Sequence, residues 1–165
     1  MQRYFSIPLL FFFIASTLGL LLRWHFISPL ESVRYPYLLH AHSHIMFLGW
    51  VFNTLYLAYV FSYVRTKWIS RYRVLFMMLQ ILVLGMLISF PLQGYGLFSI
   101  IFSTLHTILA GVFLVLFLQD LKQDTLKNSA SVWFVKTSLF FLLLSSLGPF
   151  SLGFLMANEL GQSNW

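Results

Sequence analysis

The strongest constraint in this sequence is a series of long apolar runs that carry almost no charge. A helix needs roughly 20 mostly apolar residues to cross a bilayer. Five such runs occupy residues 5–24, 38–62, 74–92, 97–118 and 132–156. Inside lipid the backbone must satisfy its own hydrogen bonds, and unbroken runs without two-residue alternation favour helices over a barrel. The sequence therefore predicts an all-α, polytopic membrane bundle of about five helices, forming one transmembrane domain over residues 1–165.

The composition supports this class and excludes others. Only 8% of the 165 residues are charged, against about 25% in a typical soluble domain. The chain has no cysteine, which excludes disulfides, zinc fingers, iron–sulfur clusters and covalently attached haem. The four carboxylates lie in predicted loops or the tail, which disfavours a carboxylate relay for protons or sodium inside the membrane; they are Glu31, Asp120, Asp124 and Glu159.

The basic residues predict how the helices are oriented, because Lys and Arg accumulate in short cytoplasmic loops. Seven of them are expected on one side, namely Arg3, Arg65, Lys67, Arg71, Arg73, Lys122 and Lys127, against Arg23 and Arg34 on the other. The N-terminus is therefore expected inside, and the first run is expected to stay as a helix rather than be cleaved as a signal peptide. The net charge of +6 is then a topology signal, not a sign of nucleic-acid binding, and the pattern fits a bacterial inner membrane.

Three alternating histidines form the densest polar signal, in the segment HAHSHIMFLGW at positions 40–50. On a helix His40 and His44 share one face, whereas His42 points away from it. Neutral imidazole is a good ligand for iron, copper or zinc, and ionisable residues within a span usually face a bundle interior. All three are therefore candidate metal ligands. The plainer interpretation places His40 and His42 among lipid headgroups and makes His44 a hydrogen-bonded packing residue.

A fourth histidine, His106, lies within the fourth run. At 1.5 Å per residue it is expected about 14 Å from the outer face, and His44 about 10 Å. Two histidines at similar depth on different helices could hold one metal ion or a non-covalent b-type haem between them. The alternative is that His106 bonds to a neighbouring Ser or Thr.

Several small and polar residues within the apolar runs are expected to affect how the helices pack or bend. Gly49 and Gly85 either let helices approach closely or make room for a flat cofactor. Asn53 and Thr54 are deep enough to hydrogen-bond to another helix. Pro149 is expected to kink the fifth run.

The histidine segment resembles the second-helix motif of the haem–copper oxidase subunit I superfamily and of related NnrS-type membrane proteins. The resemblance implies that a histidine near the outer end of an early helix, followed by an apolar run and glycine, is a haem or metal ligand. His44 matches that position best, and His40 is second. The stretch SSLGPFSLG at 145–153 is similar to a helix of the same group. The family has many more helices than the five predicted here, so complete oxygen- or nitric-oxide-reducing chemistry is not expected in this chain alone.

Three functional hypotheses follow. The first is a membrane protein that binds haem b, or copper, through His44, His106 and His40, with a role in electron transfer or sensing. The second is a cofactor-free structural or assembly subunit of a membrane complex. The third is a small metal or solute transporter with His40 and His44 as its entry site. The expected partners are the lipid bilayer and other membrane subunits or a second copy of the chain, and not nucleic acid.

Overall fold

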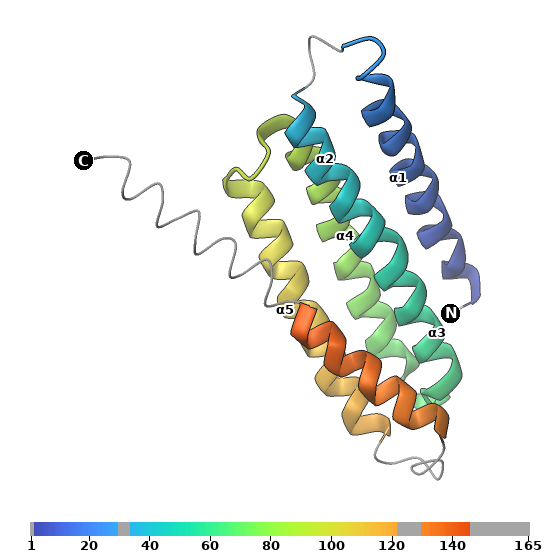
Figure 1. Ribbon diagram of the computed structural model, residues 1–165. Coiled ribbons are helices and arrows are strands. Elements are labelled where there is room, and N and C mark those ends of the chain that lie inside the picture. The colour runs from blue at the N-terminus through green and yellow to red at the C-terminus, as the bar shows by residue number, and fades with distance from the viewer. Residues whose placement is uncertain (1, 30–33, 122–129, 146–165) are drawn as a thin grey trace. The chain divides into compact units, whose positions relative to one another are not determined.

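The computed structural model describes residues 2–29, 34–121 and 130–145, which are helical apart from short turns and contain no strand (Figure 1). Contacts divide the chain into two compact units, Met1–Phe113 and Leu114–Trp165. The expected all-α membrane bundle is confirmed, because four helices are long and apolar enough to cross a membrane.

The first unit is built from helical rods joined by short turns, so that consecutive rods run in opposite directions (Figure 1). The first rod is η1 (Gln2–Phe5) followed by α1 (Ser6–Trp24). The second contains α2 (Tyr35–His44), η2 (Ile45–Phe52) and α3 (Asn53–Tyr63). The third contains η3 (Thr66–Trp68) and α4 (Ile69–Gln93). The fourth is α5 (Leu97–Leu121), which begins in this unit and ends in the second.

The helices extend beyond the apolar runs that predicted them. The third span was expected from residue 74, but α4 begins at Ile69. The guanidinium of Arg71 lies 4.1 Å from the centroid of the Trp68 ring. Arginine over an aromatic ring is stabilised where a helix meets the membrane surface. The basic turn therefore continues the helix instead of ending it.

The fifth expected span, 132–156, is described only in part. The structure shows a shorter apolar helix, Ala130–Ser145, in the second unit. In it the Lys136 ammonium lies 5.2 Å from the centroid of the Trp133 ring. The expected kink at Pro149 and most of the SSLGPFSLG stretch lie outside the described residues.

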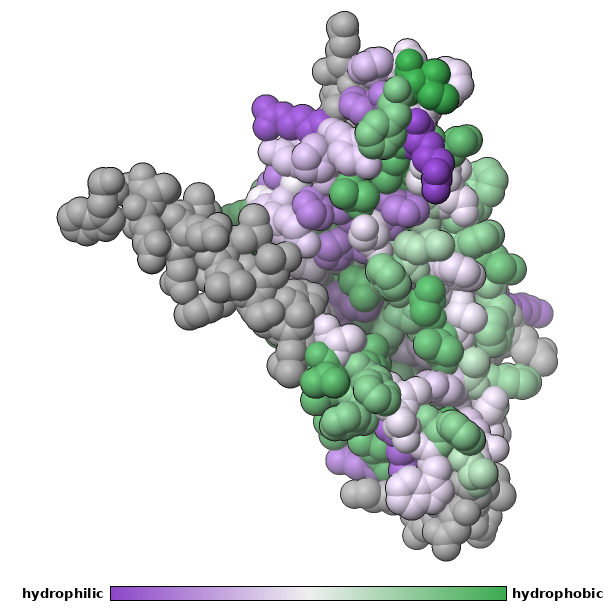
Figure 2. Space-filling view, viewed as in Figure 1, coloured by the Kyte–Doolittle hydropathy of each residue, from purple (hydrophilic) through white to green (hydrophobic). Residues whose placement is uncertain are grey.

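The first unit has a buried apolar core, and its outer faces are also apolar. Buried side chains from α1, the second rod and α4 form one cluster of this core: Phe11, Ala15, Ala41, Ile45, Val83, Met86 and Phe90. Many other large apolar side chains point outward, including Phe13 at 69% exposure and Ile81 at 65%, and Figure 2 shows hydrophobic side chains along the visible face. Such a surface is unfavourable in water and favourable in lipid. The protein is therefore a multi-pass membrane protein.

Two glycines let the helices of the first unit approach closely. A Cβ at Gly49 would lie 3.0 Å from Cγ of Phe11, and one at Gly85 would lie 2.7 Å from Cδ1 of Phe102. Neighbouring side chains thus fill the space beside both glycines. Of the two interpretations offered by the sequence, close helix packing is the one that the structure shows.

Candidate functional site

The second rod changes its winding directly after the histidine motif. The α-helix α2 ends at His44, and Ile45–Phe52 is π-helical before α3 resumes at Asn53. Most π-helical segments are short, and they occur frequently at functional sites. The apolar pattern of the sequence does not predict this π-helical segment. Its one visible sign is Gly49, a poor helix former in the middle of the segment.

His44 faces α4 with one ring nitrogen fixed. Its Nδ1 lies 2.9 Å from the backbone oxygen of His40. Since a carbonyl only accepts, Nδ1 carries the proton and donates, which leaves Nε2 with a free lone pair. The ring packs on Phe90, with centroids 4.1 Å apart and an interplanar angle of 30°. His44 is thus held in the tautomer whose Nε2 can accept a hydrogen bond or bind a metal.

His40 lies one turn closer to the end of the rod, beside the α4–α5 turn. Its ring centroid is 4.4 Å from that of Tyr95, at 66°. Gly94 makes this turn with a φ of 58°, a conformation that glycine adopts readily. Burial raises the pKa of the Tyr95 hydroxyl, so Tyr95 presents a neutral ring to His40.

His42 faces the opposite way, as helical spacing predicts. Its Nδ1 lies 2.9 Å from the backbone oxygen of Ala15 on α1. In the part of the chain that the structure describes, no three His, Cys, Asp or Glu side chains are grouped as a metal site requires. The candidate ligands His40, His42 and His44 therefore do not converge on a single ion, because alternate residues of a helix point in different directions.

His106 is buried in α5, with 1% of its surface exposed. Its ring meets Phe52 edge-on, with centroids 5.3 Å apart. Among the described residues Nε2 has no hydrogen-bond partner. Two nearby hydroxyls donate elsewhere, since Ser103 donates to the Ile100 carbonyl and Thr107 to the Ser103 carbonyl. The alternative in which a Ser or Thr satisfies this nitrogen is therefore not found.

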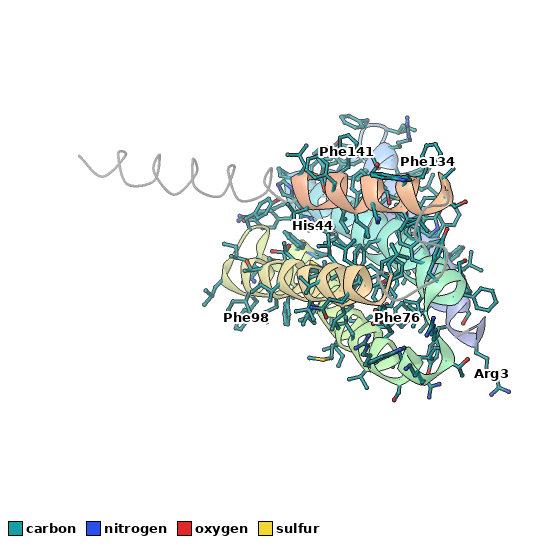
Figure 3. All side chains as sticks on the ribbon, turned by 90° about the horizontal axis from the view of Figure 1, so that it is seen from below. Arg3, His44, Phe76, Phe98, Phe134 and Phe141 are labelled. Atoms are coloured by element: carbon teal, nitrogen blue, oxygen red, sulfur yellow. The ribbon has the colours of Figure 1, made fainter. Side chains whose placement is uncertain are left out.

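His106 and His44 come from different helices, and their side chains are close enough for electrostatic interaction. Figure 3 labels His44 on the second rod and Arg3, which projects outward from the first. The two histidines present a buried imidazole nitrogen without a partner among the described residues, and a second imidazole whose Nε2 carries a lone pair.

A buried amide pair fixes the rod on the other side of the π-helical segment. Asn53 Nδ2 donates to the Gly49 carbonyl at 2.8 Å and to Gln80 Oε1 at 2.9 Å. Gln80 Nε2 donates back to Asn53 Oδ1 at 3.2 Å. The expectation that Asn53 bonds to another helix is confirmed. Thr54 instead donates to the Trp50 carbonyl within its own rod.

Helical bundles serve many unrelated functions, so the fold alone does not assign one. The chemistry that distinguishes this bundle is the pair His44 and His106 and the groups that hold them. Comparison with protein-family models, with curated proteins and with solved structures finds no match to this chain.

Proposed function

We propose that the protein binds a b-type haem in the membrane through His44 and His106, with a role in electron transfer or sensing. The observation that carries this proposal is Nε2 of His106, which is buried without a hydrogen-bond partner among the described residues, in a side chain that interacts electrostatically with that of His44. A buried polar atom without a partner costs about 1–3 kcal/mol. An iron or other metal centre would be coordinated by the lone pair of such a nitrogen.

The donor chemistry of the two residues fits this cofactor. Imidazole nitrogens would hold the iron of a haem, and because the sequence has no cysteine the attachment would be non-covalent. His44 already makes the bond to a backbone carbonyl that ligating histidines usually make through their second nitrogen. When bound, haem would supply one-electron redox chemistry. His40, one turn away on the same face, is the second candidate partner for His44.

The surrounding residues hold the two imidazoles in place. Phe90 packs against the ring of His44, and Phe52 packs against that of His106. Both phenylalanines are buried, so they keep water from this part of the bundle. The Asn53–Gln80 pair holds the far end of the π-helical segment and so sets the rotation of the rod that carries His44.

Oxidase-like membrane proteins supply the context for this proposal. The resemblance of residues 40–50 to oxidase subunit I suggests that the chain is a relative of those proteins. We propose a bacterial inner membrane, with the N-terminus inside. The orientation is supported because the N-terminus lies at the same end of the first unit as the basic α3–α4 turn (Figure 1). Other membrane subunits or a second copy would supply further redox groups.

Cofactor content tests the proposal. The full chain is purified in detergent from haem-replete cells, and haem and transition metals are quantified beside the variants His106→Leu and His25→Gln. His25 lies at the end of α1, outside the site, so its variant is the matched control. We expect stoichiometric haem in the wild type and in His25→Gln, and its loss in His106→Leu. A stoichiometric metal ion without haem would overturn the haem proposal and assign the pair to that ion. The absence of both would favour a cofactor-free subunit.

A further inference from the structure

A pocket of about 610 Å³ lies between α1 and α2, at the end of the first unit opposite the N-terminus. Ligand pockets commonly have volumes of this order. Its polar walls are Arg23, Tyr35 and His42, and its apolar walls include Leu22, Phe26 and Leu39. None of these residues belongs to the His44–His106 site. The mixed lining fits a molecule with a polar end and an apolar body.

Arg23 gives the pocket a positive charge that no other described side chain neutralises. The second arginine at this end, Arg34, donates to the hydroxyl of Tyr37 at 3.1 Å and does not line the pocket. Arg23 has no ion pair or side-chain hydrogen bond among residues 2–29, 34–121 and 130–145. A guanidinium at a membrane surface binds phosphate strongly, through paired charged hydrogen bonds.

His42 provides the pocket with a hydrogen-bond acceptor. Because its Nδ1 donates to the Ala15 carbonyl at 2.9 Å, its Nε2 has a lone pair to accept with. Gly19 makes room for the ring, since a Cβ there would lie 2.9 Å from Cε1 of His42. A ligand that suits both polar residues must therefore offer an anionic oxygen to Arg23 and a hydrogen-bond donor to His42.

We propose that this pocket binds the headgroup of an anionic glycerophospholipid whose headgroup carries hydroxyl groups, as in phosphatidylglycerol. The phosphate would face Arg23, a glycerol hydroxyl would donate to Nε2 of His42, and the acyl chains would follow the apolar walls into the bilayer. Phosphatidylcholine offers the phosphate without a donor. Phosphatidylethanolamine offers a donor without net negative charge. Charge complementarity favours the anionic lipid, because the charged group in the pocket is a cation.

Native mass spectrometry of the detergent-solubilised full chain tests this. Phosphatidylglycerol, phosphatidylethanolamine and phosphatidylcholine with identical acyl chains are titrated separately. We expect phosphatidylglycerol to bind about tenfold more tightly than phosphatidylcholine, the effect of the one hydrogen bond to His42 that phosphatidylcholine cannot make. Equal binding of phosphatidylglycerol and phosphatidylcholine, or of phosphatidylglycerol and phosphatidylethanolamine, would overturn the proposal.

Pairs of matched variants test whether the lipid binds in this pocket. Arg23→Gln should abolish the preference for phosphatidylglycerol over phosphatidylethanolamine, which depends on charge, whereas Arg34→Gln should retain it because Arg34 is outside the pocket. Gly19→Ala should weaken binding by pushing the His42 ring into the pocket. Gly111→Ala, where nothing lies within 4 Å of the added Cβ, should not. Equal loss in Arg23→Gln and Arg34→Gln would show a diffuse charge effect and overturn the site.

A competition distinguishes a lipid from a soluble phosphate ester. Glycerol 3-phosphate lacks acyl chains, so we expect it not to displace phosphatidylglycerol at equal concentration. Full displacement would assign the pocket to a free phosphate ester and overturn the lipid proposal. These measurements do not involve haem, so failure here leaves the proposed function unaffected, and failure there leaves this proposal unaffected.

Discussion

At the scale of single residues, His106 is the most informative side chain, because it has a polar atom in an apolar place. Its Nε2 is buried and has no partner among the described residues. Such an atom lowers stability unless a ligand uses it. Replacing His106 should therefore raise the stability of the cofactor-free protein while it abolishes cofactor binding.

Replacing His106 by leucine should raise the stability of the cofactor-free protein by about 1–3 kcal/mol, because the unpaired nitrogen is removed and the volume is roughly kept. The same change should abolish cofactor binding. Unfolding of the cofactor-free protein in detergent measures the first effect. A loss of stability would show that His106 already makes a favourable polar contact, which contradicts this account.

The Asn53–Gln80 pair should behave in the opposite way. Asn53→Leu leaves the Gln80 amide without its partner and should destabilise the protein, whereas Asn53→Leu with Gln80→Leu should cost less than the sum of the single changes. Interhelical hydrogen bonds in membranes are worth about 0.6–2 kcal/mol, so we expect a coupling energy of that size from a double-mutant cycle. Additive effects would mean that the two amides do not stabilise each other.

At the scale of helices, apolar length and short connections predicted the four long spans well. A helix needs about 20 apolar residues to cross a bilayer, and runs of this length can be recognised directly in the sequence. The π-helical segment Ile45–Phe52 could not be predicted in this way, because the same apolar residues form either winding. The unpaired Nε2 of His106 could not be predicted from the sequence either, since Ser103 and Thr107 lie close enough along the chain to suggest a hydrogen bond to it.

Close approach of α4 and α5 depends on Gly85. Gly85→Ala should destabilise the protein by about 1–3 kcal/mol, because the added Cβ would lie 2.7 Å from the Phe102 ring and overpacking costs this much. Gly111→Ala is the control, and should be neutral or stabilising by up to about 1 kcal/mol through helix propensity. Thermal unfolding of the two variants measures the difference. Equal stability would mean that Phe102 moves aside freely.

At the scale of the whole molecule, the charges of the loops predict a topology that the lack of native cysteine makes simple to test. Ser28 and Ser70 are exposed residues near opposite ends of the first unit. In intact cells an impermeant maleimide should label Ser28→Cys, because that end is expected outside, and should label Ser70→Cys only after permeabilisation. The reverse pattern would invert the orientation.

The measurement that tests the central claim most directly is a reduced-minus-oxidised absorption spectrum of the purified full chain. The proposal predicts the bands of a six-coordinate b-type haem in the wild type and in His25→Gln. It also predicts their loss or conversion to a five-coordinate spectrum in His44→Ala and in His106→Leu. A featureless wild-type spectrum from cells able to insert haem, or unchanged bands in both site variants, would contradict haem ligation by His44 and His106.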